Sequence, residues 1–328
     1  MVQNSFFDNS VGAAQVQPIA QFNEGQDLFS EAVVLNLTLR SMGTSRKLDD
    51  TQYEVDASKE KTTATKKICR SDELEAITKL IGEVRKWIKS RTVPTKIKGG
   101  MLIMRLQLVP AMYAYIEEAQ AKLCNLVEIF IAKYPDLKWR DSLPASEGGL
   151  GSTYDASDYP DVDKLYDLFE IACVPMEMGA PGKLKAIDKL AYEKAAAACK
   201  ADMDSAVESA RDLLLTEAQA IFTHLQECLI PGADGKAKTF KNSLVPNALE
   251  WLSNFNFRDF GSPQELRDMV ERAKQVLQGV TSDSLRKSDQ LKASIGATVS
   301  TIKSAIDVLV INRPGRKISL NDEWGGDL

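Results

Sequence analysis

The stretch KLKAIDKLAYEKAAAACKADMDSAVESARDLLLTEAQAIFTHLQECL, residues 183–229, contains neither glycine nor proline. Its apolar and small residues recur in steps of three and four, which places them on one face of an α-helix. This predicted packing stripe consists of Ile187, Ala191, Ala195, Cys199, Met203, Ala206, Ala210, Leu214, Ala218, Ile221, Leu225 and Cys228. The predicted helix is much longer than the usual globular helix of about 11 or 12 residues. We therefore expect it to lie against another long element, as helices do in bundles, stalks, adaptors and assemblies.

Three short strands are predicted before this helix. In residues 32–41 and 101–109 apolar side chains alternate along the chain, which is the period of a strand with one buried face. The segment EIACVPMEM, residues 170–178, is interpreted as a third strand, and Pro175 restricts it to the edge of a sheet. The long polar segment from Gly43 to Lys67 is expected to be an exposed loop.

Helical patterns occupy most of the remaining chain. One predicted helix is capped by Ser71, and a second runs from Pro110 to about residue 133. The apolar face of the first consists of Leu74, Ile77, Leu80, Ile81, Val84 and Ile88. After residue 230 the pattern predicts a helix over 244–259, a helix capped by Ser262 and ending near residue 279, and a helix over 283–312. Gly296 within the last of these is expected to mark a close contact with another helix.

The predicted fold class is mainly α, an α+β arrangement in which a long-helix bundle accompanies a small antiparallel three-stranded sheet. The expected organisation is a flexible N-terminal arm over 1–28, a mixed helix and sheet region over 29–182, a long-helix bundle over 183–312 and a polar tail over 313–328. A chain of 328 residues with 44% hydrophobic residues is long enough to form a substantial core.

Composition and cysteine usage indicate the cellular environment. The five cysteines form no CxxC pair, so we interpret them as buried free thiols in a reducing cytoplasm. The N-terminal residues lack the basic start and apolar core of a secretory signal. No stretch approaches about 20 consecutive apolar residues, so a membrane span is not expected.

Catalytic and metal-binding patterns are sparse, and we predict no catalytic, cofactor-binding or metal-binding residues. His224 is the only histidine, and the chain contains no GxSxG pattern for a nucleophile elbow. The acidic loop with Asp155, Asp158, Asp161 and Asp163 could attract a hard cation, although helix capping explains these carboxylates better. The glycines of SEGGLGS, residues 146–152, lack the lysine and hydroxyl residue of a phosphate-binding loop.

One segment has a distinctive charge. Residues 59–105 contain 13 Lys or Arg against 5 Asp or Glu, a net charge of +8 in a chain of −5, so the remainder carries −13. The candidate basic face consists of Lys86, Trp87, Lys89, Arg91, Lys96, Lys98 and Arg105. Such a face could contact the phosphates of DNA or RNA, with Trp87 available to stack on a base. It could also dock an acidic protein surface, including another copy of the chain, or simply be solvated.

The order of elements resembles a known family. A strand in VVLNLTLRSMGTSRKL, a GG-containing strand that ends at Val109 and Pro110, and FEIACVPMEM before a long Ala-rich helix are similar to domain of unknown function 3150. This is an uncharacterised bacterial and phage family, and the likeness covers about residues 30 to 230. The resemblance implies an accessory protein of phages or mobile elements that acts as partner, substrate or adaptor of a MoxR-type AAA ATPase. It defines no functional residues.

These observations lead to three hypotheses of different classes. The leading one is a non-enzymatic helical structural or adaptor subunit that forms a homo-oligomer or docks a protein partner, in a bacterial or phage-infected cytoplasm. The second is a nucleic-acid-binding accessory protein that uses residues 59–105. The third is a membrane-active helical protein in which GGMLIMRLQLV, residues 99–109, inserts into the bilayer.

Overall fold

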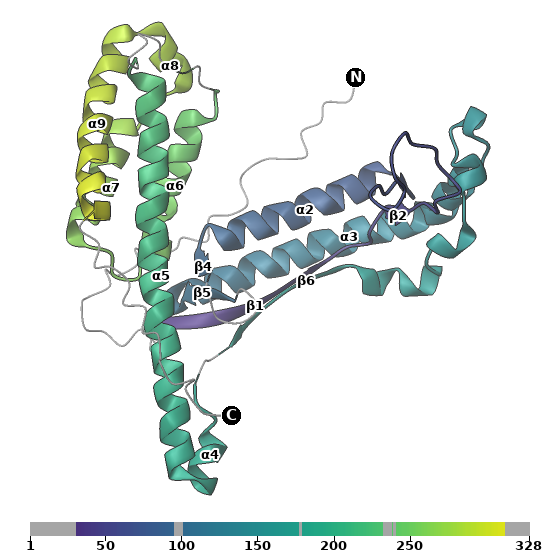
Figure 1. Ribbon diagram of the computed structural model, residues 1–328, viewed down its shortest axis with the longest axis horizontal. Helices are drawn as coiled ribbons and strands as arrows, with labels where there is room; N and C mark the ends of the chain where they lie inside the picture. Colours follow the sequence, from purple (N-terminus) through teal and green to yellow (C-terminus); the bar gives the residue numbers. More distant parts are fainter. Residues whose placement is uncertain (1–30, 95–100, 177–178, 232–237, 239–240, 312–328) are drawn as a thin grey trace. The chain divides into compact units, whose positions relative to one another are not determined.

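The computed structural model describes residues 31–94, 101–176, 179–231, 238 and 241–311 (Figure 1). Contacts within the chain divide these residues into two compact units, one ending at Asp204 and the other beginning at Ser205. The division falls within the long helix, whereas the sequence placed a boundary at residue 182. The predicted N-terminal arm over 1–28 and the predicted C-terminal tail over 313–328 lie outside the described residues.

The fold is mainly α with a small antiparallel sheet, as predicted. In the first unit, β1 (Ala32–Arg40) lies between β5 (Leu102–Arg105) and β6 (Glu170–Met176) and pairs antiparallel with both. These are the three predicted strands, but the second was predicted to extend to residue 109 and ends at Arg105, where helical turns begin. The sheet has a fourth strand, β4 (Thr92–Pro94), which pairs with β5 and is too short to show a periodicity in sequence.

Strand β6 lies at one edge of the sheet, as Pro175 predicted. The proline has no N–H to offer to a further strand. The amide side chain of Gln120 donates a hydrogen bond of 2.8 Å to the carbonyl of Ile171, which is also on β6. Both features protect an edge that would otherwise invite strand addition.

Two long helices of the first unit pack together. In α2 (Asp72–Lys89), Ser71 is the N-cap and its hydroxyl accepts the Leu74 N–H at 3.3 Å, as predicted. The predicted apolar face of α2 is buried throughout, at Leu74, Ile77, Leu80, Ile81, Val84 and Ile88. This face packs toward α3 (Val109–Asp141), which in turn packs on β6 through the contact of Met112 with Cys173.

Helix α3 continues for eight residues beyond the predicted end at residue 133, through Pro135. A proline inside a helix removes one hydrogen bond and crowds the preceding turn. In α3 the buried face continues on both sides of the proline, at Tyr134 before it and at Leu137 and Asp141 after it. Burial of this face therefore outweighs the local cost of the proline.

The segment from Gly43 to Lys67 is not entirely a loop. Its ends form a two-stranded ribbon of β2 (Ser45–Lys47) and β3 (Thr65–Lys67). Short 3-10 turns occupy the segment before α3 and the long connection from α3 to β6, namely η1 (Leu106–Leu108), η2 (Ala145–Glu147), η3 (Gly151–Thr153), η4 (Ala156–Asp158), η5 (Val162–Lys164) and η6 (Tyr166–Leu168).

A buried carboxylate ties the ribbon to this connection. Asp141, the last residue of α3, accepts the backbone N–H of Cys69 at 2.6 Å and the hydroxyl of Tyr159 at 3.0 Å. Cys69 follows the ribbon and has a left-handed backbone with φ of 49°. The carboxylate thus holds three separate segments of the first unit together.

The long predicted helix is interrupted near its start. It consists of α4 (Gly182–Ile187) and α5 (Lys189–Leu229), separated by Asp188, whose backbone is extended with φ −150° and ψ 109°. The Asp188 carboxylate accepts the Ala191 N–H at 3.1 Å, so this residue caps α5. The prediction of one unbroken helix from residue 183 was therefore wrong, because a good N-cap residue competes with helix continuation.

The same arrangement recurs near the end of the chain. The predicted helix over 283–312 consists of α8 (Ser282–Lys287) and α9 (Asp289–Ile311). Ser288 between them is extended, and its hydroxyl accepts the Leu291 N–H at 3.1 Å. Asp188 and Ser288 thus terminate two six-residue helices in the same way.

The second unit is a helical bundle around one core. It comprises the later part of α5 together with α6 (Leu244–Arg258), α7 (Gln264–Leu277), α8 and α9. All five helices contribute buried side chains to this core, for example Phe222, Phe255, Val270, Leu285 and Ile302. A Cβ atom on Gly296 would lie 3.1 Å from the Ile230 side chain, which confirms the close helix contact expected there.

The predicted cap at Ser262 was wrong. No side chain caps α7, and the Ser262 N–H instead donates to the Asp259 carboxylate at 2.7 Å. The other oxygen of Asp259 accepts from Arg267 at 2.8 Å. The acidic residue therefore organises the turn between α6 and α7.

One described helix, α9, is long and apolar enough to cross a membrane by length and composition alone. The sequence predicts no membrane span here, because polar and charged residues such as Lys292, Ser300 and Lys303 interrupt the apolar run. In this structure Ile295, Val299, Ile302 and Ile306 of α9 are buried in the core of the second unit.

Replacement of Asp141 by alanine is expected to destabilise the first unit by about 2 to 4 kcal/mol, because two buried donors lose their acceptor. Urea denaturation of the whole chain measures the change. Asp136→Ala, at an exposed position on the same helix, is the control and is expected to change stability by less than about 0.5 kcal/mol. Equal effects of the two substitutions would show that the Asp141 hydrogen bonds contribute nothing.

Candidate interaction surface

The predicted packing stripe changes character along α5. From Met203 onward it is buried at Met203, Ala206, Ala210, Leu214, Ala218, Leu225 and Cys228. Ile221 is half-buried, and its neighbour Phe222 is buried in its place. None of residues 181–202 is fully buried.

We call residues 182–202, which comprise α4 and the first turns of α5, the arm. This name does not refer to the predicted N-terminal arm over 1–28. Four of the predicted stripe residues lie in it. Ala191, Ala195 and Cys199 are half-buried, and Ile187 is 83% exposed at the end of α4. Leu190 is also 61% exposed. The arm therefore presents apolar side chains that no core of the described chain takes up.

Helix α4 lies alongside the first turns of α5 (Figure 1). The Lys185 ammonium lies 5.8 Å from the centroid of the Tyr192 ring, a cation–π contact that joins the two helices. Alanine has the highest intrinsic helix propensity, and residues 195–198 are four consecutive alanines. Local propensity and continuity with the buried part of α5 thus favour the helix where burial contributes little.

The residues of the candidate basic face differ in their exposure. Lys86 and Lys89 are exposed on α2 and Arg91 is half-buried just beyond it, while Lys96 and Lys98 lie outside the described residues. Arg105 is only 3% exposed and lies 3.9 Å from the carboxylate of Glu31, so its assignment to a surface face was wrong.

Trp87 is already engaged in stacking. Its indole stacks on Tyr115 of α3 at 4.4 Å with an interplanar angle of 8°, and the Arg91 guanidinium lies 4.3 Å from the indole centroid. The expectation that Trp87 is available to stack on a base was therefore wrong.

Of the proposed membrane-inserting segment, residues 99–109, the structure describes 101–109, which contain β5, the turn η1 and the first residue of α3. Ile103, Met104 and Leu108 within it are buried. Its apolar side chains belong to the interior of the first unit.

His224, the only histidine, is exposed on α5. Its Nδ1 lies 4.0 Å from the Cys228 sulfur one turn away, and that thiol is buried. Burial raises the pKa of Cys228, which opposes formation of the thiolate that a nucleophile needs. This pair is therefore a poor match to a cysteine–histidine hydrolase.

The acidic loop is organised by internal contacts. Asp158 lies 2.6 Å from Lys66 and 3.9 Å from Arg46, both on the β2–β3 ribbon. Asp155 accepts the Ser157 N–H, and Asp161 pairs with Lys164, which lowers the pKa of both carboxyl groups. Within the described ranges, no group of three or more histidine, cysteine or acidic residues could hold a metal ion.

The backbone conformation explains the glycines near residue 150. A Cβ on Gly149 would lie 2.0 Å from the Leu143 carbonyl oxygen, and Gly148 has φ of 85°. These positions require glycine because the backbone turns tightly after α3.

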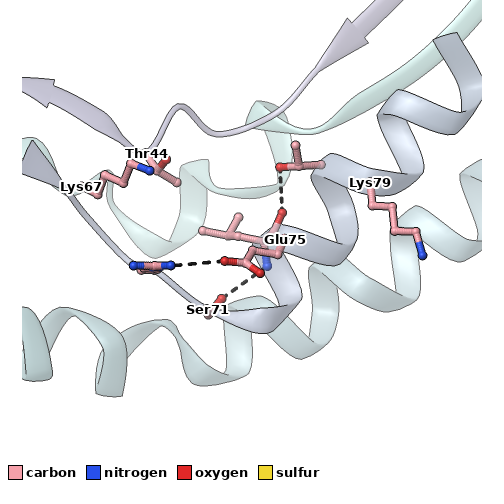
Figure 2. Close-up of a pocket in the computed structure, with 8 residues that line it drawn as sticks. Thr44, Lys67, Ser71, Glu75 and Lys79 are labelled. Atoms are coloured by element: carbon pink, nitrogen blue, oxygen red, sulfur yellow. Dashed lines mark hydrogen bonds and ion pairs between the residues drawn. The ribbon is translucent and has the colours of Figure 1, made fainter. Parts of the chain in front are cut away.

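A pocket of about 370 Å³ lies at the start of α2 (Figure 2). Thr44, Lys67, Ser71, Glu75 and Lys79 line it and are labelled in the figure. Glu75 lies 3.9 Å from Arg70 across the pocket, and the first turn of α2 is acidic. Positive and negative groups are mixed here, so the lining selects no single class of ligand.

Comparisons with protein-family models, curated proteins and solved structures gave no match for this chain. The resemblance to domain of unknown function 3150 therefore stays a prediction.

The arm is the surface that the geometry singles out. Sequence periodicity located its stripe but gave no sign that burial begins only at Met203.

The five cysteines are free, and their surroundings predict very different reactivities. Burial, reinforced by the Asp141 charge, raises the pKa of Cys69 to about 12, and burial raises that of Cys173 to about 11. Cys124 is exposed on α3 and Cys199 is half-buried, so the prediction of burial was wrong for these two cysteines.

In native protein at pH 8, we expect iodoacetamide to modify Cys124 quickly and to leave Cys69 and Cys173 unmodified, because their thiolates form only near pH 11 to 12. Peptide mass spectrometry measures each site. All five thiols should react in urea, which is the control. Native labelling of Cys69 as fast as that of Cys124 would contradict the buried environment.

Proposed function

We propose that this protein is a non-enzymatic structural or adaptor subunit that docks another protein chain through the arm. The observation that supports this most directly is the unburied part of α5. The same helix face forms a core after Met203 and lacks one before it.

The free energy of burying apolar surface favours a partner that covers the arm. Burial of an apolar side chain contributes about 25 cal/mol per Å² of apolar surface removed from water. Tyr192, Ala195 and Cys199 of the arm are only half-buried, so they still expose apolar surface that a partner could cover. A preformed helix also loses little conformational entropy on binding, which lowers the cost of association.

The resemblance to domain of unknown function 3150 adds a candidate for the larger machine, a MoxR-type AAA ATPase in a phage or mobile-element setting. This partner follows from the resemblance alone.

Nucleic acid remains a second candidate partner because Lys86 and Lys89 are exposed together near the end of α2. Phosphate contacts by such residues would give affinity that falls steeply with salt concentration. Trp87 already stacks on Tyr115, and Arg105 is buried. The candidate basic face therefore presents few cations to a nucleic acid.

Site-specific photo-crosslinking tests the docking proposal. We expect p-benzoylphenylalanine at Tyr192, in cells that make the native protein, to form a discrete protein adduct on illumination. The same amino acid at Tyr113 is the matched control, since this exposed tyrosine lies outside the arm on α3. Absence of an adduct from position 192, or equal adducts from both positions, would contradict docking through the arm.

A further inference from the structure

We propose that the chain seated on the arm is the arm of a second copy, paired antiparallel about a two-fold axis between Ala196 and Ala197. This inference rests on the proposed function and specifies its partner. A two-fold pair is also the commonest symmetry of protein homo-oligomers.

The contact surface is a strip of small residues with one aromatic ring. Tyr192, Ala195, Ala196 and Cys199 are half-buried and follow each other at i, i+3, i+4 and i+7. This spacing places them on one face of α5, in line with buried Met203. Small side chains let two helix axes approach closely, since the axial distance depends on the side chains at the contact.

Charges beside this strip are self-complementary. Lys189, Glu193, Lys200 and Asp204 are all exposed and lie at intervals of four, seven and four residues. At about 100° per residue they fall within an arc of about 60° on one flank of the strip. Reversing the direction of the sequence exchanges the basic and acidic members of this set.

Antiparallel pairing turns this pattern into ion pairs. In a two-fold antiparallel helix pair, the same flank of both helices meets. With the axis between Ala196 and Ala197, Lys189 faces Asp204 of the second copy and Glu193 faces Lys200 of the second copy. Each pairing occurs twice. A parallel pair in register would instead bring this flank against the opposite flank of the second copy, so these ion pairs would not form.

Within one chain the Lys189–Glu193 ion pair is weak. Lys189 lies 3.8 Å from Glu193, and their side chains are 80% and 58% exposed. Such an exposed pair contributes little and can exchange for contacts between chains. Across an interface, charge pairs of this kind mainly select partner and orientation, while the apolar strip supplies contact area.

The two ends of the strip differ in their surroundings. Lys185 of α4 contacts the Tyr192 ring, so α4 borders the strip at that end. Leu190 lies on the opposite face of α5 and takes no part in this pairing.

Charge exchange tests the arrangement. Mass is measured by light scattering behind size exclusion over a dilution series of the full chain. We expect wild type to dimerise, and Glu193→Lys and Lys200→Glu each to weaken dimerisation about tenfold or more through like-charge contacts. The double variant E193K/K200E restores opposite charges across the axis and is expected to dimerise like wild type.

Lys194→Glu is the matched control, since it makes the same charge change as Lys200→Glu at an exposed position outside the flank. Its dimerisation should match that of wild type. A wild-type chain that is monomeric at every concentration would overturn the proposal, as would a double variant as weak as the single ones.

A second measurement needs no substitution. Isotope-labelled and unlabelled wild-type protein are mixed and treated with a carbodiimide, which joins lysines to adjacent carboxylates. We expect mixed-isotope peptides that join Lys200 to Glu193 and Lys189 to Asp204. Crosslinks confined to single-isotope pairs would contradict pairing between copies.

These outcomes separate the two proposals. A photo-adduct from position 192 at twice the chain mass of 36.2 kDa supports both. An adduct of another mass supports docking through the arm and overturns the second copy as its partner. No adduct overturns both.

Discussion

The arrangement of core and surface in this protein depends on the point at which one face of helix α5 becomes buried. In α5 the face that carries Met203, Ala206 and Ala210 is buried, and it continues into the core of the second unit at Leu214 and Ala218. Before Met203 the same face carries small and aromatic side chains that remain partly accessible. A single continuous helix thus serves first as a surface and then as a core element, because its second part packs against the apolar faces of α6, α7, α8 and α9.

Helical and strand periodicity predicted the fold class well because burial follows it closely. Every predicted apolar residue of α2 is buried, and the three predicted strands pair antiparallel. Periodicity could not locate the helix ends, where local hydrogen bonds compete with it. Asp188 and Ser288 interrupt predicted helices by capping the next one. Pro135 fails to interrupt α3 because Leu137 and Asp141 after it continue the buried face.

The candidate sites show a different limit of sequence reasoning. Charge counting identified a basic segment, yet Arg105 is buried near Glu31 and Trp87 stacks on Tyr115, partners that are distant along the chain. Asp158 is likewise paired with Lys66 of the ribbon. The self-complementary charges of the arm are different, because their relation depends only on spacing along one helix. They could have been read from the sequence once the exposed strip beside them was known.

The most direct test of this account is hydrogen exchange along α5, followed by mass spectrometry as the full chain is diluted. The account predicts that amides of residues 189–202 exchange much faster than those of residues 206–225 in dilute protein, and become protected as the concentration rises. Protection of residues 189–202 equal to that of residues 206–225 at every dilution would contradict it, because the arm would then already be covered within its own chain.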